Sequence, residues 1–97
     1  MDNWPFSDPP NLVSITVRQV VHGGQPILHV VHDADDGGWQ FLTGDAFEVA
    51  DGMVVSLAGM VTRDRSLAEL AGLPLGWKAW RSAPGAPWQR GPSEADA

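Results

Sequence analysis

The sequence contains no cysteine. This absence excludes disulfide frameworks, thiolate zinc sites, redox motifs and cysteine nucleophiles, and it is compatible with a cytoplasmic protein. Long apolar runs are also missing, since no stretch approaches the roughly 18 residues that a membrane helix needs. The first ten residues, MDNWPFSDPP, lack the basic start and the apolar run of a signal peptide. We therefore expect a cytoplasmic protein that has no membrane partner.

Basic residues are scarce and unevenly placed. Six Lys and Arg stand against 12 Asp and Glu, which gives a formal net charge of −6. Because affinity for phosphate comes largely from clustered Lys and Arg, this balance argues against nucleic acid as a partner. Between Gln19 and Thr62 there are six acidic residues and no Lys or Arg. This acidic half indicates either an ordinary solvated surface or a patch that is available to a basic protein partner.

The chain has 97 residues, of which 43% are hydrophobic. A chain of this size can bury one core without disulfides or metal. We expect an irregular, proline-rich arm over 1–13, a single α+β domain over 14–82, and a Pro/Gly-rich tail over 83–97.

Alternating β-branched residues predict a strand over 14–22 that places Ile15, Val17 and Val21 on one face. Gly23-Gly24 predicts a tight hairpin turn, because both glycines accept the positive φ of such a turn. A returning strand follows over 27–33.

The next segments extend this hairpin to an antiparallel meander. The acidic turn 34–38 leads to a third strand, in which Trp39 and Phe41 point inward. The short apolar run 53–58 predicts a further, buried strand.

One short helix is expected in the second half. Ser66 and Glu69 fit a capping box at its start, and Gly72 suits its end. A last strand over 76–82 completes the prediction. The fold class is α+β, with an antiparallel meander of four to five strands and one short helix packed on the sheet.

The histidines and the acidic turn are the two candidate metal sites of the sequence. In a regular strand His29 and His32 point to opposite faces, so ordinary strand histidines are favoured over a zinc site with His22. The run that begins at Asp33 departs from a calcium loop, because Gly37 and Gly44 occupy the fifth and twelfth positions, where ligands are needed. We expect no metal and no cofactor.

No catalytic motif of a known kind is present. Asp45, Glu48 and Asp51 could supply acid or base groups, but no nucleophile is paired with them by spacing. We therefore expect a protein that is not an enzyme.

Five tryptophans are unusual in a chain of this length. We expect Trp39 and Trp77 in the core. Trp80 has the opposite parity to Trp77, so it lies outside unless a tryptophan of the arm or the tail packs over it. An exposed Trp80 beside Lys78 and Arg81 would be a good interface anchor, because Trp and Arg dominate binding hot spots.

Two stretches carry a resemblance to a known family. The segment Val54–Arg81 contains an apolar strand, a short helix, and then Leu73-Pro74-x-Gly76 and Ala79-x-Arg81. The first half contains Gly38-Trp39-x-Phe41-Leu42-x-Gly44-Asp45 after an acidic turn. Both resemble a bacterial domain family of unknown function that is grouped with predicted immunity proteins of polymorphic toxin systems. The resemblance covers roughly residues 14–82, and it implies a non-enzymatic bacterial protein that binds and blocks a toxin.

The sequence thus predicts a protein-binding, immunity-like module whose partner is a basic protein such as a toxin domain. The expected binding residues are Asp35, Asp36, Asp45, Trp80 and Arg81. One alternative is a homo-oligomeric structural or accessory domain, such as a homodimer formed through edge strands and exposed tryptophans. A weaker alternative is a small-ligand or metal-dependent enzyme that uses His22, His29 and the Asp45 loop.

Overall fold

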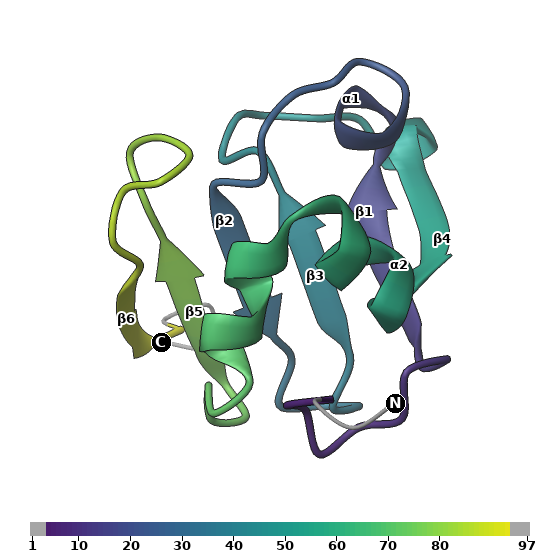
Figure 1. The fold of residues 1–97 in the computed structure, drawn as a ribbon. Coiled ribbons are helices and arrows are strands. Elements are labelled where there is room, and N and C mark those ends of the chain that lie inside the picture. Colours follow the sequence, from purple (N-terminus) through teal and green to yellow (C-terminus); the bar gives the residue numbers. More distant parts are fainter. Residues whose placement is uncertain (1–3, 94–97) are drawn as a thin grey trace.

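A six-stranded sheet carries helical segments on one of its sides in the computed structural model, which describes residues 4–93 (Figure 1). In chain order, the elements are β1 (Val13–Val17), α1 (Arg18–Val21), β2 (His29–His32), β3 (Trp39–Leu42), η1 (Val49–Asp51), β4 (Gly52–Ser56), α2 (Leu57–Arg63), η2 (Arg65–Leu70), β5 (Trp77–Trp80) and β6 (Gln89–Pro92), where η marks a 3-10 helix.

The strand order across the sheet is β4-β1-β3-β2-β5-β6. β1 and β3 run parallel, with Ile15 opposite Gln40, whereas the other four neighbouring pairs are antiparallel. The predicted α+β class is confirmed. The predicted meander of four to five antiparallel strands is only roughly matched, because the sheet is mixed. Of the predicted hairpins, only the one between β2 and β3 forms.

The Gly23-Gly24 pair ends a helical turn instead of forming the predicted β-hairpin. The backbone N–H groups of His22 and Gly23 both donate to the Arg18 carbonyl, at 2.8 and 3.1 Å. Gly24 follows with φ at 71°, a conformation that glycine adopts at little cost. Paired glycines serve a helix end as readily as a primed turn, so the local sequence alone left both open.

Ser14 and Thr16 form the inward face of β1, and Ile15 does not share the burial of Val17, although the predicted alternation puts the two on one face. Ser14 and Thr16 are buried, whereas Ile15 keeps 39% of its surface exposed. The Thr16 hydroxyl donates to the Phe41 carbonyl at 2.7 Å, so its burial leaves no polar group unpaired. The parallel register places Ser14 beside Trp39, where a small side chain leaves room for the indole.

The apolar run 53–58 was predicted as a buried strand, but it divides between an edge strand and a helix. β4 lies at the edge of the sheet, and Val54 is 69% exposed. The Ser56 hydroxyl accepts the Gly59 N–H at 3.0 Å, which caps the start of α2. Leu57 therefore begins a helix, and this helix was not predicted.

The one predicted helix exists as the 3-10 helix η2, with a different cap. The Asp64 carboxylate accepts the Ser66 N–H at 3.0 Å, so Asp64 stands at the cap in place of the predicted Ser66. Glu69 is exposed, while Leu67 and Leu70 point into the core.

The segment assigned to a tail contributes a strand. β6 pairs antiparallel with β5 and forms the second edge of the sheet (Figure 1). Trp88, just before it, is buried. The physical reason is that β5 would otherwise leave a full row of backbone groups unpaired. The last residues of the predicted tail, 94–97, and the first three of the arm lie outside the described residues.

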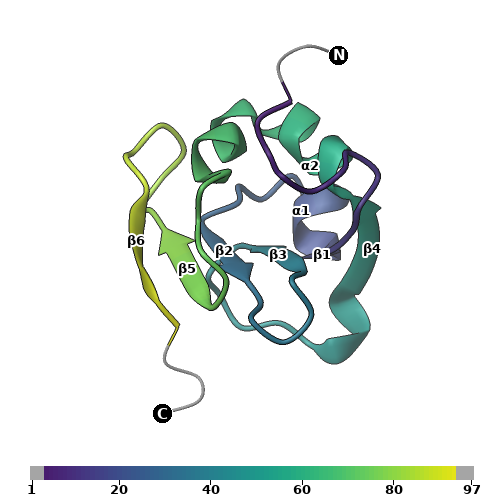
Figure 2. The same cartoon turned by 90° about the horizontal axis from the view of Figure 1, so that it is seen from below.

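The core fills the space between the sheet and the helices. The sheet supplies Trp39 and Phe41, whose inward orientation is confirmed, together with Val30 and Ala79. The helical segments, the arm and the loops supply Phe6, Leu57, Met60, Leu67, Leu70 and Leu73. Seen from below, the helices lie together on one side, and the connection from β3 to β4 passes on the other side (Figure 2). The sheet therefore has a covered face and an open face.

Candidate binding site on the open sheet face

The open face is built from the outward residues of the central strands. Because side chains alternate along a strand, residues next to the buried Val30 and Ala79 point away from the helices. His29 lies opposite Trp80 and Val31 opposite Lys78 in the β2–β5 register. Figure 2 shows α2 and η2 on the opposite side of the sheet, whereas the β3–β4 connection, which contains η1, passes on this side.

A cleft of about 400 Å3 opens on this face beside β2 and β5. Its walls are Leu28, His29, Thr43, Gly44, Asp45, Lys78, Trp80 and Arg81. Three of the five predicted site residues thus line one cleft, although they come from segments 35 residues apart in the sequence. The β3–β4 connection brings Asp45 to the strand end where Trp80 stands.

Trp80 is held in a defined position at this cleft and keeps 40% of its surface exposed. A Cβ at Gly91 would meet the indole at 3.5 Å, so the glycine provides a flat seat for the ring. The Lys78 ammonium lies 5.5 Å from the ring centroid, a cation–π distance. Trp88 packs elsewhere, so the alternative in which a tail tryptophan covers Trp80 does not occur.

The acidic residues do not form one patch. Asp35 and Asp36 belong to the turn between β2 and β3, at the opposite end of β3 from Asp45. Asp35 lines a second cleft on the open face, together with Val31 and Gln40. Asp36 accepts the N–H of Gly38 at 2.8 Å and stabilises the turn. The acidic groups therefore stand at both ends of the open face, and Trp80 lies at the end where Asp45 stands.

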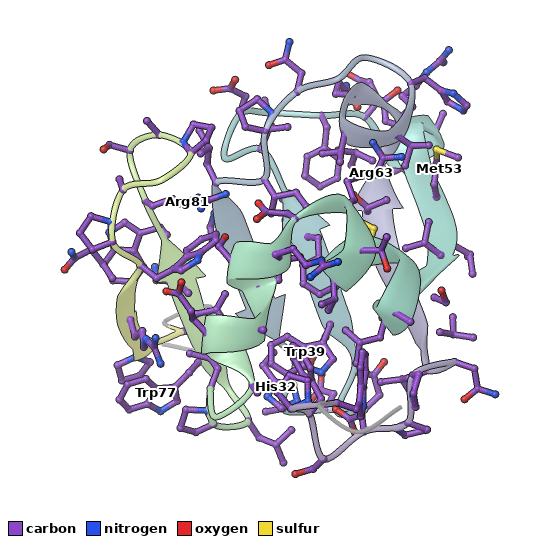
Figure 3. The ribbon with its side chains drawn as sticks, in the orientation of Figure 1. His32, Trp39, Met53, Arg63, Trp77 and Arg81 are labelled. Carbon is purple, nitrogen blue, oxygen red and sulfur yellow. The ribbon has the colours of Figure 1, made fainter. Side chains whose placement is uncertain are left out.

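Arg81 is placed differently from the expectation of an exposed contact residue. Its side chain is 2% exposed and its guanidinium points into the covered side (Figure 3). It donates to the Ile27 carbonyl, to Ser66 and to Asp64, and it stacks on Trp88 at 4.2 Å. Arg81 follows the alternation of β5 and lies on the side of the buried Ala79, so its prediction as a binding residue is wrong. We assign it to the fold and not to the binding surface.

Of the three carboxylates that could have supplied acid or base groups, Asp51 has a structural role. It accepts the Glu48 N–H at 3.0 Å and the Gln19 side-chain amide at 2.9 Å. These hydrogen bonds lower the pKa of Asp51, with the Glu48 backbone as the larger cause. Asp51 thereby ties the β3–β4 connection to α1.

His29 supplies the unpaired polar atom of the cleft. Its Nε2 is buried and makes no hydrogen bond with any group in residues 4–93. Burial, and secondarily the charge of Lys78, lower the pKa of His29 below its ordinary value of 6.5. The sequence analysis considered His29 only with His22 and the Asp45 loop, because the pairing of His29 with Trp80 depends on a strand order that the sequence does not show.

The lowered pKa of His29 predicts a loss of stability in acid. As the pH falls through 6.5, the unfolded chain takes up the proton before the folded chain does, so the free energy of unfolding decreases. The contribution is fully present above the unfolded pKa and is lost on the way down to the folded pKa. We expect His29→Gln to reduce the drop in Tm between about pH 8 and about pH 5.5.

The matched control is His22→Gln at the exposed end of α1. Thermal unfolding of the three proteins at the two pH values measures the effect. An identical drop in Tm for the wild type and His29→Gln would show that His29 is protonated equally in both states.

For residues 4–93, the structure also bears on the expectations about a metal site and a membrane-spanning helix. Within residues 4–93, no three His, Asp or Glu side chains gather closely enough to hold a metal ion. His22 lies at the end of α1 and His29 in β2, so the weaker alternative of a shared metal site has no geometry to support it. No helix in this part of the chain has the length and apolarity that a bilayer crossing requires.

Comparison with known proteins gives no relative. No family model, curated protein or solved structure matches this chain. The resemblance to the immunity-protein family gains no support from these comparisons, and it stays a prediction on the motifs quoted above.

Proposed function

We propose that this chain is a non-enzymatic protein-binding module that receives a basic partner, such as a toxin domain, on the open face of its sheet. The observation that carries the proposal is Trp80, which is 40% exposed and fixed between Gly91 and Lys78 at the mouth of a cleft. An indole held in one position loses little conformational entropy on binding, and tryptophan is the commonest hot-spot residue.

The cleft also offers a polar contact. Buried polar atoms in proteins nearly always have a hydrogen-bond partner, so the unpaired Nε2 of His29 is exceptional. A polar group of the partner that enters beside Trp80 would pair with this atom. This hydrogen bond would fix the orientation of the partner, in addition to the surface area that the interface buries.

The charge of the partner follows from the ends of the open face. Asp45 stands at one end and Asp35 at the other, and the whole chain has a net charge of −6. A basic partner is steered by such a field, and its association rate falls as salt screens the charges. The cleft is lined by two cations, of which Arg81 is paired with Asp64 and Lys78 lies 5.5 Å from the centre of the Trp80 ring.

The binding test uses a toxin domain encoded beside this chain's gene. We expect Trp80→Ala to raise the Kd by about 30-fold or more, because a hot-spot tryptophan contributes about 2 kcal/mol or more. Reversing Asp35 and Asp45 to lysine is expected to lower the association rate and to flatten its dependence on salt. Surface plasmon resonance at several salt concentrations measures both effects.

The control is Leu75→Ala, which also removes an exposed apolar side chain, but from the loop between η2 and β5. It should leave the Kd unchanged. Equal affinity of the wild type and Trp80→Ala for the partner would remove Trp80 from the interface, and unchanged salt dependence after charge reversal would remove the acidic ends.

A further inference from the structure

The two edges of the sheet differ in how they are protected. β6 carries Arg90 and ends in Pro92, which has no N–H to offer. Charge and proline on an edge strand are the usual devices against pairing with another chain. β4 carries the sequence GMVVS, with neither a charge nor a proline, and within residues 4–93 it pairs on one side only. β4 is therefore the edge that is free to accept a further strand.

In the middle of β4, backbone N–H and C=O groups point outward, away from β1. The Leu57 N–H donates to the Leu12 carbonyl at 2.9 Å, so these opposite residues form a hydrogen-bonded pair. Bonding alternates along an antiparallel pair, which turns the backbone groups of Val55 toward β1 and those of Gly52 and Val54 outward. Val54 thus offers one N–H and one C=O at the centre of the edge.

The side chains beside this edge are exposed and apolar. Val54 is 69% exposed, its partner Ile15 on β1 is 39% exposed, and Val13, two residues along β1 and opposite Ser56, is 62% exposed. Antiparallel pairing of β4 with a second β4 would place Val54 against Val54. The row Ile15–Val54 would then continue across the two-fold axis into the same row of the other copy.

The charges near the edge select a second copy over a basic partner. Pairing about Val54 sets Gly52 opposite Ser56, and Asp51 opposite Leu57, of the second copy. No carboxylate meets another carboxylate along the paired strands, although the chain as a whole is acidic. A basic protein, in contrast, would find no opposite charge on this uncharged strand.

We infer that two copies of this chain associate through β4, in an antiparallel arrangement centred on Val54, into one continuous sheet. This inference is independent of the proposed function, because β4 lies at the far edge of the sheet from Trp80. Specific, stable interfaces bury about 1,200–2,000 Å2 in total, and a contact through one five-residue strand is smaller. We therefore expect the dimer to be weak and reversible.

Analytical ultracentrifugation from low-micromolar to near-millimolar concentration tests the association. We expect a shift from monomer to dimer for the wild type, and a monomer throughout for Val54→Lys, which sets two ammonium groups against each other at the axis. Leu75→Lys, which places the same charge at an exposed apolar site away from β4, is expected to dimerise as the wild type does. Circular dichroism confirms that both variants are folded.

The absence of cysteine allows a second test of the contact itself. A single cysteine at Val54→Cys should be linked to its own copy by a short bis-maleimide within minutes, whereas Leu75→Cys should not. A wild type that stays monomeric at near-millimolar concentration overturns the inference. Equal cross-linking of the two cysteine variants overturns the placement of the axis at β4.

Discussion

Replacing Arg81 by methionine is expected to lower the free energy of unfolding by about 3–5 kcal/mol, because it removes one partner of a buried ion pair. The guanidinium donates to the Asp64 carboxylate at 2.6 Å, to Ser66 at 2.9 Å and twice to the Ile27 carbonyl. Its side chain is 2% exposed, against 23% for Asp64. Methionine would leave the Ile27 carbonyl without its two hydrogen bonds and the Asp64 carboxylate without its counter-charge, although Asp64 would keep the hydrogen bond from the Ser66 N–H.

The loss would be a large part of the total stability, which is about 5–15 kcal/mol for a domain of this kind. Each kcal/mol should lower Tm by about 4–8 °C. Chemical denaturation followed by circular dichroism measures the change. Arg90→Met is the control, since Arg90 is exposed and, within residues 4–93, donates to the Glu69 carbonyl alone, and it should stay within about 0.5 kcal/mol of the wild type.

A double-mutant cycle separates the ion pair from the carbonyl contacts. Asp64→Asn keeps an oxygen that can cap η2 but removes the charge. If Arg81 and Asp64 interact as described, the double variant should cost less than the sum of the single variants, by about 0.5–3 kcal/mol. Strict additivity would mean that Arg81 stabilises the fold through Ile27 and Trp88 and not through the carboxylate.

Truncation of Trp39 to alanine is expected to cost about 3–5 kcal/mol, the range for large aromatic residues in a core. The indole is 1% exposed and stacks on the His32 ring at 3.9 Å (Figure 3). Phe6 from the arm meets it edge-on at 5.3 Å, and its Nε1–H donates to the Asp8 carboxylate at 2.9 Å. The alanine variant would lose the packing and release the arm from the sheet.

Trp39→Phe tests how the cost divides. It keeps a ring in the core but removes the hydrogen bond to Asp8, so we expect a smaller loss of about 1–3 kcal/mol. Trp80→Ala is the matched tryptophan control and should cost less than half as much as Trp39→Ala. Urea unfolding followed by far-UV circular dichroism avoids the change in fluorescence. A Trp39→Ala protein as stable as Trp80→Ala would contradict the assignment of Trp39 to the core.

The inward and outward faces of β3 and β5 could be predicted from the local sequence pattern. Alternation about the acidic turn placed Trp39 and Phe41 inward, and parity placed Trp80 on the side opposite to Ala79. These predictions rest on the two-residue period of a strand, which does not depend on the neighbours. Arg81 was predicted as a contact residue, and its burial against Asp64 depends on where η2 lies, which cannot be read from spacing.

The first half shows where local pattern is insufficient. Gly23-Gly24 permits a hairpin turn or a helix end. It ends the helix α1, because β1 pairs with β3 and β4 and not with β2. Ser14 and Thr16 point inward against their hydropathy, since the neighbouring Trp39 fills the space and the Phe41 carbonyl satisfies the hydroxyl of Thr16. A strand pattern cannot reveal such compensation.

The sequence by itself determined the α+β class, the acidic charge, the inward Trp39 and Phe41 and the outward Trp80, because composition and strand period are local properties. Only the tertiary structure decided the mixed strand order, the strand β6, the burial of Arg81 and the cleft that joins His29 and Asp45 to Trp80. These features depend on which strands become neighbours. That choice is made by the packing of the whole chain, where segments distant in the sequence compete for the same backbone hydrogen bonds and the same core volume.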